Sequence, residues 1–287
     1  MIEELDETTA RFDIQELVLG WRRLNGEPPR LRLTTRVGLK SDLGCVRDNN
    51  EDKAEFYEPI DPPTLAARGS VYCVADGMGG HAAGQIASEL AVKSAIAAYY
   101  SDMDNTPDVA MVQAVRQAND TVREAAIEAP ERAGMGTTFT ALSLVQGHAL
   151  VTHLGDSRAY LLRDGELRQI TTDHTWVEEQ VQNGVMTRAQ AESSPYRNII
   201  TRCIGTEPTI DVDSFAVDTR TGDIWLLCSD GLTGHVEDDE IQSIVDGAGP
   251  SEACRQLITL ACARGGSDNV TALIVKIEDM ETVEVAA

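Results

Sequence analysis

The strongest constraint on the fold is a set of four aspartates at the ends of short apolar segments. Three of them follow such a segment, one precedes it, and each stands close to a glycine. Asp76 follows VYCVA, Asp156 follows ALVTHLG, Asp230 follows IWLLCS, and Asp268 lies in GGSDNV just before an apolar run. Each one alone is typical of a turn, because an aspartate side chain caps local backbone. Together, at the ends of buried strands, they would gather several anions at one rim of a core. Such anions repel one another unless cations neutralise them.

The apolar segments are short, rich in β-branched and aliphatic residues and bounded by turn residues, which predicts strands. They cover Val71–Ala75, Phe139–Val145, Ala149–Leu154, Arg158–Arg163, Glu166–Thr171, Asp223–Cys228 and Val270–Ile277. Gln146-Gly147 and Asp164-Gly165 stand between neighbouring strands and predict tight hairpin turns. Hairpins between neighbours indicate antiparallel sheets instead of a parallel, doubly wound one.

Five further segments have an apolar face at helical spacing, which predicts helices. They are Ala82–Tyr100, Pro107–Ala129, Thr175–Gln182, Asp238–Val245 and Ser251–Ala263. Helices with one apolar face beside hairpin-built sheets indicate an α+β fold in layers, with the sheets at the centre and the helices outside.

One domain is expected over residues 35–279, because no internal repeat, low-complexity tract or second linker interrupts them. Residues 1–34 form an extension, in which apolar positions from Ile14 to Leu24 share one face of a short helix. This helix is expected to dock on its own domain, with a partner or a second copy as the alternative. Residues 280–287 form a C-terminal tail.

The net charge of −23 indicates a surface that repels nucleic acid and anionic lipid, so neither is expected as a partner. No apolar run reaches the ~18 residues of a membrane helix, and the N-terminus is acidic where a secretory signal is basic. A cytoplasmic protein is therefore expected.

The six cysteines show no CxxC pair and are interpreted as small buried apolar residues.

The acids indicate which metals to expect. The chain has no His/Cys cluster, so zinc and copper are disfavoured. Carboxylates with backbone carbonyls and water suit magnesium, manganese or calcium, and no EF-hand loop is present. Glu51 and Asp52 add two acids in the segment SDLGCVRDNNED. Two such metals about 3.5–4 Å apart activate water for phosphate ester hydrolysis. Arg47 can bind phosphate from the same segment, although a surface arginine is the ordinary interpretation.

Eight segments together resemble one known family. They are SDLGCVRDNNED, VADGMGGHAAGQIAS, GMGTTFTAL, HLGDSRAYLLRDGEL, TTDHTW, NIITRCIG, LLCSDGLTGHV and GGSDNVTALIV. In this order they resemble the PPM family of metal-dependent serine/threonine phosphatases, the protein phosphatase 2C type, and its bacterial branch most. The resemblance implies a four-layer αββα sandwich. It also implies that a metal-bridging hydroxide hydrolyses phosphoserine and phosphothreonine in other proteins, some of them substrates of serine/threonine kinases.

The resemblance implies manganese or magnesium as the cofactor, with two core ions and a weaker third ion. The implied ligands are Glu51, Asp76 and the carbonyl of Gly77 for the first ion, and Asp76, Asp230 and Asp268 for the second. Asp156 and Asp230 would hold the third ion.

The resemblance also implies roles outside the ligand set. Arg47 would bind the substrate phosphate, and Asp52 would orient metal-bound water. Met78 stands where many eukaryotic members have a histidine that is proposed to protonate the leaving oxygen. His81 would contact substrate or donate a proton, with capping of the following helix as the alternative. Residues 174–202 would form a flap that helps to choose substrates.

Two competing interpretations remain in view. A catalytically silent binding module of the same fold would need a broken ligand set, yet Glu51, Asp76, Asp230 and Asp268 are all present. A kinase or nucleotide-binding regulator is disfavoured, because no GxxxxGK[ST] loop occurs and GMGG is followed by histidine.

Overall fold

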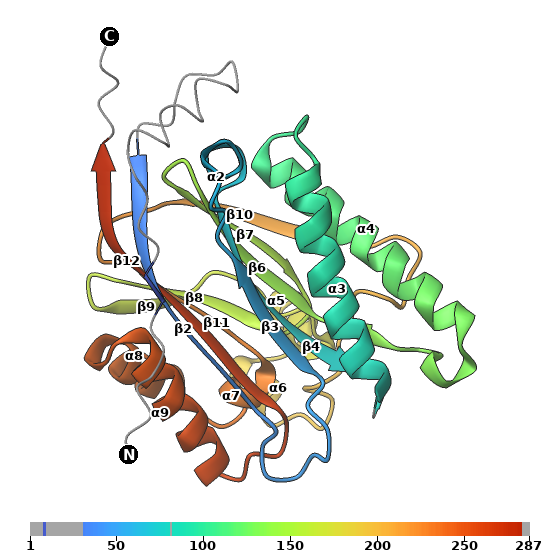
Figure 1. Ribbon diagram of the computed structural model, residues 1–287. Helices are drawn as coiled ribbons and strands as arrows, with labels where there is room; N and C mark the ends of the chain where they lie inside the picture. The colour runs from blue at the N-terminus through green and yellow to red at the C-terminus, as the bar shows by residue number, and fades with distance from the viewer. Residues whose placement is uncertain (1–7, 10–30, 81, 283–287) are drawn as a thin grey trace.

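Two antiparallel sheets lie face to face between two pairs of helices in the computed structural model, which describes residues 8–9, 31–80 and 82–282 (Figure 1). One sheet has the strand order β1-β2-β12-β11-β8-β9. The other has the order β10-β7-β6-β4-β3, with β5 against β4. The predicted α+β architecture of four layers is confirmed. The helix expected between Ile14 and Leu24 lies outside the described residues, and so does His81.

The strands and helices have the following bounds. The strands are β1 (Thr8–Thr9), β2 (Leu31–Asp42), β3 (Asp52–Tyr57), β4 (Ser70–Met78), β5 (Gly136–Thr137), β6 (Phe139–Val145), β7 (His148–Leu154), β8 (Arg158–Arg163), β9 (Glu166–Gln169), β10 (Asp213–Asp218), β11 (Ile224–Cys228) and β12 (Val270–Thr282). The helices are α2 (Pro62–Arg68), α3 (Ala82–Ser101), α4 (Pro107–Glu128), the short 3₁₀ helix Pro130–Arg132, α5 (Trp176–Gln182), α6 (Arg188–Glu192), α7 (Asp230–Thr233), α8 (Asp238–Gly247) and α9 (Pro250–Ala263). Over the described ranges, none of these helices is both long enough and apolar enough to cross a bilayer.

Alternation of side chains along the strands divides the core into three apolar layers. In β4, Val71, Cys73 and Ala75 pack beneath α3 and α4, whereas Tyr72 and Val74 point toward the other sheet. The same alternation in β11 and β12 separates residues beneath α8 and α9 from residues between the sheets. Each sheet therefore buries both of its faces, which explains why its central strands are almost wholly apolar.

The predicted hairpins are confirmed by their backbone angles. Gln146 and Asp164 have φ values of 53° and 54°, and the glycine after each also has a positive φ. Two successive residues at positive φ are typical of the two-residue turns that join twisted antiparallel strands.

Both ends of the expected domain extend further than the sequence indicated. β2 begins at Leu31 and β12 ends at Thr282, and these two residues are partners in the sheet. The β2–β12 pairing therefore extends beyond the domain boundaries that were expected at residues 34 and 280.

His153 on β7 is a buried base with a partner at each ring nitrogen. Its Nδ1 atom lies 2.9 Å from the Thr140 hydroxyl, and its Nε2 atom lies 3.0 Å from the Thr172 carbonyl oxygen. Because a carbonyl only accepts, Nε2 carries the proton that faces Thr172. Burial, aided by the nearby His174 ring, lowers the pKa of this imidazole to about 3.

We expect acid to destabilise the fold through His153. The unfolded chain gains this proton near pH 6.5, whereas the folded chain gains it only near pH 3. The neutral His153 ring therefore contributes fully to the free energy of unfolding above pH 6.5, and this contribution is lost as the pH falls toward 3. At pH 5 the loss is about 2 kcal/mol. Urea unfolding at pH 7 and pH 5 should show a smaller loss in His153→Gln than in the wild type. His148→Gln, at an exposed site, is the control; equal losses in all three proteins would show that His153 is not the group responsible.

Candidate active site

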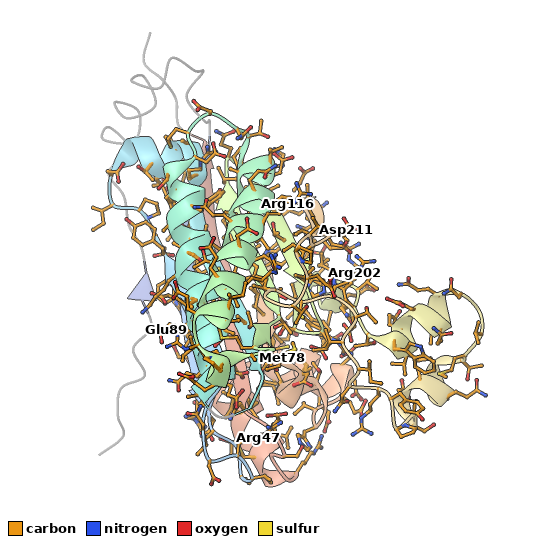
Figure 2. The ribbon with its side chains drawn as sticks, turned by 90° about the vertical axis from the view of Figure 1, so that its right-hand side faces the viewer. Arg47, Met78, Glu89, Arg116, Arg202 and Asp211 are labelled. Carbon is orange, nitrogen blue, oxygen red and sulfur yellow. The ribbon has the colours of Figure 1, made fainter. Side chains whose placement is uncertain are left out.

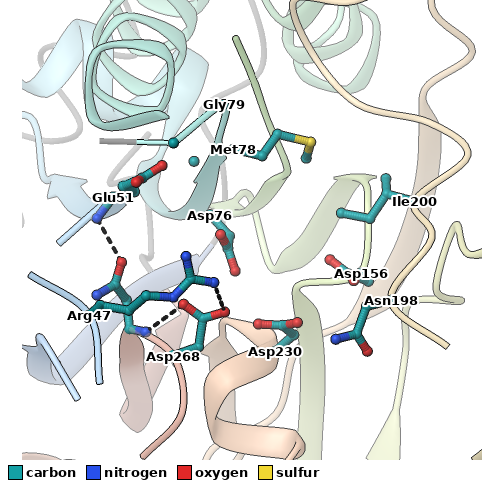
Figure 3. A pocket seen from close by; sticks show the side chains of 13 residues that line it. Arg47, Glu51, Asp76, Met78, Gly79, Asp156, Asn198, Ile200, Asp230 and Asp268 are labelled. Carbon is teal, nitrogen blue, oxygen red and sulfur yellow. Dashed lines mark hydrogen bonds and ion pairs between the residues drawn. The ribbon is translucent and has the colours of Figure 1, made fainter. Parts of the chain in front are cut away.

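One pocket of ≈ 240 Å³ collects the predicted site residues from several strand ends (Figure 3). Its lining includes every predicted metal ligand together with Arg47: Glu51, Asp76, Gly77, Asp156, Asp230 and Asp268. Figure 3 shows the side chains of Asp76, Asp230 and Asp268 directed toward a shared space. Asp52 is not part of this lining. It lies beside Asp76, as its partner across β3 and β4.

The backbone of β4 fixes where Asp76 stands. Its amide donates to the Thr138 hydroxyl (2.8 Å), and its carbonyl accepts from the Thr138 amide (2.9 Å) and the Thr137 hydroxyl (2.8 Å). Asp76 is thus held by Thr137 and Thr138 through both its amide and its carbonyl, two residues before the end of β4. Its carboxylate reaches the pocket because β4 ends there and not because a flexible loop carries it.

Burial and mutual repulsion make the acidic cluster costly to ionise. The pKa values of Asp76 and Asp156 are raised well above their usual range, first by burial and then by neighbouring carboxylates. Burial and the charge of Asp268 also raise the pKa of Asp230. Burial raises the pKa of Asp52 to about 7. Charged carboxylates in such a setting require a positive partner close by.

Three buried carboxylate oxygens in this region have no hydrogen-bond partner: Oδ1 of Asp52, Asp156 and Asp230. Buried polar atoms without partners are rare in folded proteins, and those at functional sites mark places where an ion or ligand binds. The available donors are all oxygens, the chemistry that magnesium and manganese prefer. The residues therefore fit a centre of hard divalent cations.

Arg47 already neutralises one of these acids. Its Nη2 atom lies 2.7 Å from Oδ2 of Asp268, whose Oδ1 accepts from the Asn269 amide (2.8 Å). This ion pair, above all its hydrogen bond, raises the pKa of Arg47. In the described part of the chain, no three acids, histidines or cysteines are yet arranged around one point as ion ligands. The ion pair therefore occupies one carboxylate oxygen of Asp268 and one end of the Arg47 guanidinium.

The comparisons with known proteins agree with this geometry. The family model described as protein phosphatase 2C matches residues 64–264. The serine/threonine phosphatase Stp of Listeria monocytogenes is 35% identical over 243 residues, which cover 83% of this chain and 94% of the relative.

The chain belongs to the protein phosphatase 2C family.

Mycobacterial relatives extend the comparison. The serine/threonine protein phosphatase PstP of Mycobacterium tuberculosis is 38% identical over 256 residues, covering 88% of this chain. The match spans only about half of that relative, 47% of its length. The crystal structure of the catalytic domain of PstP in complex with two manganese ions superposes with a TM-score of 0.74 at 36% identity, covering 86% of this chain and all of that one. The αββα sandwich is thus the fold of the protein phosphatase 2C family.

Asn269 is a site residue of this family member that sequence reasoning did not single out. Its side-chain amide donates to the carbonyls of Leu43 (3.0 Å) and Asn49 (2.9 Å), and its Oδ1 accepts from the Glu51 amide (2.8 Å). One buried side chain therefore pins both ends of the loop that carries Arg47. These hydrogen bonds join residues 218 to 226 positions apart in the chain, so no local sequence pattern marks Asn269.

Helix α3 of this phosphatase-family fold approaches Glu51 closely. A Cβ atom at Gly84 would stand 1.8 Å from Oε2 of Glu51 and 2.9 Å from the backbone carbon of Gly77, so a larger residue would displace the Glu51 carboxylate. One turn later, the Ser88 hydroxyl donates to the Glu51 carbonyl (2.6 Å). The small residues of the predicted Ala82–Tyr100 helix therefore let the helix pack directly on a candidate ligand.

Asp52 has a position that differs from those of the other acids. Its Oδ2 accepts from the Ser229 hydroxyl (2.7 Å), and Ser229 immediately precedes Asp230. Asp52 is thus linked to the Asp230 turn through Ser229, although it is not part of the pocket lining. His81, the other predicted catalytic residue, lies outside the described residues.

Proposed function

We propose that this protein is a metal-dependent phosphatase that hydrolyses phosphoserine and phosphothreonine in other proteins. The observation that carries the proposal is the single pocket in which six predicted ligand residues surround unpartnered carboxylate oxygens, with Arg47 at the edge. Relatives that match most of the chain are named serine/threonine phosphatases, which supports the same reaction. No acid of the predicted ligand set is missing, so a catalytically silent module has no support.

Manganese or magnesium is the proposed cofactor, with two core ions and a weaker third ion. Glu51, Asp76 and the Gly77 carbonyl would hold the first core ion, and Asp76, Asp230 and Asp268 the second. Asp156 would serve the third with Asp230. When bound, such cations neutralise the carboxylates and acidify water, so that hydrolysis needs no protein nucleophile. The two manganese ions in the related PstP catalytic domain support this choice.

The protein's own groups would bind and orient the phosphate. Arg47 carries a guanidinium that can hold two phosphate oxygens through parallel hydrogen bonds. Its side chain is 49% exposed, so it can turn from Asp268 toward an incoming ester. Asp52, with a pKa raised to about 7, would orient water from its place beside Asp76. The Arg47 guanidinium, together with the bound cations, would then stabilise the negative charge on the phosphoryl group. Such electrostatic stabilisation is the dominant contribution to the rate of enzymatic phosphoryl transfer.

Turnover of a phosphothreonine peptide and of p-nitrophenyl phosphate with manganese tests the proposal. We expect hydrolysis of both, its loss on addition of a chelator, and its return with excess manganese. A folded protein that binds manganese and still hydrolyses neither substrate would support the silent module instead.

Replacement of Arg47 by alanine should mainly weaken substrate binding. The variant loses the phosphate contact but keeps the ligand set, so we expect KM for a phosphopeptide to rise about tenfold or more, with a smaller change in kcat. Steady-state kinetics at saturating manganese provide the measurement. Arg116→Ala on α4 is the matched control, because this arginine lies outside the pocket lining. Unchanged kinetic constants in Arg47→Ala would remove it from the site.

The acidic balance of the chain motivates a proposal about substrates. With a net charge of −23, the protein should attract basic segments around a phosphorylated residue. Phosphopeptides flanked by lysine or arginine should therefore show higher kcat/KM than the same peptides with glutamate, and the difference should shrink at high salt. A panel without charge preference would discard this proposal. Substrates of serine/threonine kinases are the proposed protein partners.

A further inference from the structure

His174 joins the loop that carries Asp156 to the flap (residues 174–202). Its amide donates to the Gly155 carbonyl (2.7 Å), and the Gly155 amide donates back to its Nδ1 atom (3.1 Å). Its own carbonyl accepts from the Thr201 amide at the other end of the flap (2.8 Å). Figure 2 shows α5 and α6 projecting from the body of the molecule, so these contacts stand at the base of a protruding segment.

The partners of His174 determine its tautomer. A backbone amide can only donate, so the Nδ1 atom facing Gly155 carries no proton. The proton is therefore on Nε2, which lies 3.3 Å from Oδ2 of Asp213. Burial, and then the charge of Arg202, lower the pKa of His174, which keeps the ring neutral. In this neutral form the ring has an acceptor for Gly155 and a donor for Asp213, and Nη1 of Arg202, 3.4 Å from the same Nε2 atom, donates to Oδ1 of Asp213 (3.2 Å).

The loop that His174 holds has little freedom elsewhere. Gly155 has a φ of +111°, and a Cβ atom there would stand 2.6 Å from the Thr138 side chain. On the far side of the loop, Arg158 makes three hydrogen bonds of 2.7–3.0 Å to Asp173. Asp156 lies between these anchors, is 7% exposed and has an Oδ1 atom without a partner. The Gly155 amide that His174 accepts from thus immediately precedes Asp156 in a loop that is anchored on both sides.

We propose that His174 is a positioning residue for Asp156: its Nδ1 atom fixes the Gly155 amide, and its backbone ties that loop to the flap. The inference rests on the proposed phosphatase function, in which Asp156 serves an ion and the flap contacts substrate. Asn198 and Ile200, from the second half of the flap, line the same pocket as Asp156. A shift of the flap is therefore transmitted to Asp156 through His174.

Two substitutions separate the two faces of the ring. In His174→Asn the side-chain oxygen stands as many bonds from Cα as Nδ1 does, so the acceptor for Gly155 is kept and the contact with Asp213 is lost. In His174→Gln the polar atoms stand one bond further out, near the place of Nε2, and the acceptor for Gly155 is lost. Both variants remove the imidazole, so a merely structural role for the ring predicts similar behaviour from them.

Amide exchange in the metal-free, ¹⁵N-labelled full chain gives a readout independent of catalysis. We expect slow exchange of the Gly155 amide in the wild type and in His174→Asn, and exchange at least about tenfold faster in His174→Gln. The ¹⁵N shifts of the wild-type ring should show the neutral tautomer protonated at Nε2. Equal exchange in both variants, or a ring protonated at Nδ1, would overturn the proposal.

Manganese binding and turnover then test the link to Asp156. Loss of a group that orients a metal ligand lowers affinity or activity by about 10- to 100-fold. We expect such a loss at the weakest manganese site in His174→Gln, measured by calorimetry, and near wild-type binding in His174→Asn. In an Asp156→Asn background, His174→Gln should cause no further loss. An additive loss there would mean that His174 acts otherwise than through Asp156.

The outcomes for His174 and for the proposed function can be told apart. If the wild type bound manganese but hydrolysed no phosphopeptide, the phosphatase proposal would fall. The exchange and calorimetry comparisons of the two variants would still decide whether His174 positions Asp156.

Discussion

Replacement of Asp230 by asparagine is expected to reduce manganese-dependent phosphatase activity by a factor of about 10²–10³. Asp230 lines the pocket with one buried oxygen that has no partner, and it is a proposed ligand of two ions. Asparagine keeps the shape but removes the charge that holds a dication, and loss of a single charge-stabilising group at an active site costs about 10²–10³ in rate. The measurement is kcat/KM for a phosphothreonine peptide at saturating manganese.

The matched control is Asp246→Asn, which removes the same charge from an exposed position on α8. It should retain wild-type kinetics within about twofold, because exposed charges far from the site interact weakly through water. Full activity in Asp230→Asn would refute the assignment of this carboxylate to the metal centre. An equal loss in the two variants would show that net charge, and not the pocket, determines the rate.

The same substitution should stabilise the protein when no metal is present. The raised pKa of Asp230 means that the folded chain resists ionising this carboxyl more than the unfolded chain does. At pH 7, which lies above the unfolded value, the charged group therefore destabilises the fold, and a neutral amide relieves that repulsion. We therefore expect the metal-free Asp230→Asn variant to have a higher free energy of unfolding than the metal-free wild type.

Manganese should reverse this order of stabilities. An ion that binds only the folded chain adds about 2.7 kcal/mol at a concentration 100 times its Kd. The wild type should gain this stability, and Asp230→Asn should gain much less. Thermal unfolding with chelator and with manganese provides the measurement, and Asp246→Asn should follow the wild type in both. If the variant were less stable than the wild type with chelator, Asp230 would be a stabilising residue of the metal-free fold, and the expected repulsion would be refuted.

The strands that deliver the acids could be predicted because burial on both faces leaves an unmistakable pattern. In β6 and β11 nearly every residue is buried, and both were expected almost residue for residue. β10 was missed because it is a short edge strand in which half-buried and exposed positions alternate, so it lacks a wholly apolar run. β3 was missed for a similar reason: in the sequence DKAEFY, the side chains that follow Asp52 are only partly buried.

The contacts that complete the site are long-range and leave no local pattern. Arg47 and Asp268 are 221 residues apart in the chain, so their ion pair could not be predicted. The three hydrogen bonds of Asn269 likewise depend on how the loop 43–51 folds over β12. His174 lies in a segment that resembles the family, but its role follows only from the return of the chain at Gly155 and Thr201.

Diffraction from crystals grown with excess manganese, recorded at the manganese absorption edge, tests the central claim most directly. We expect anomalous peaks inside the pocket, within coordination distance of the Asp76 and Asp230 carboxylates, with Asp268 turned from Arg47 toward an ion. Crystals that show no peak among these aspartates, with the Arg47–Asp268 pair still closed at full manganese load, would contradict a metal centre at this site.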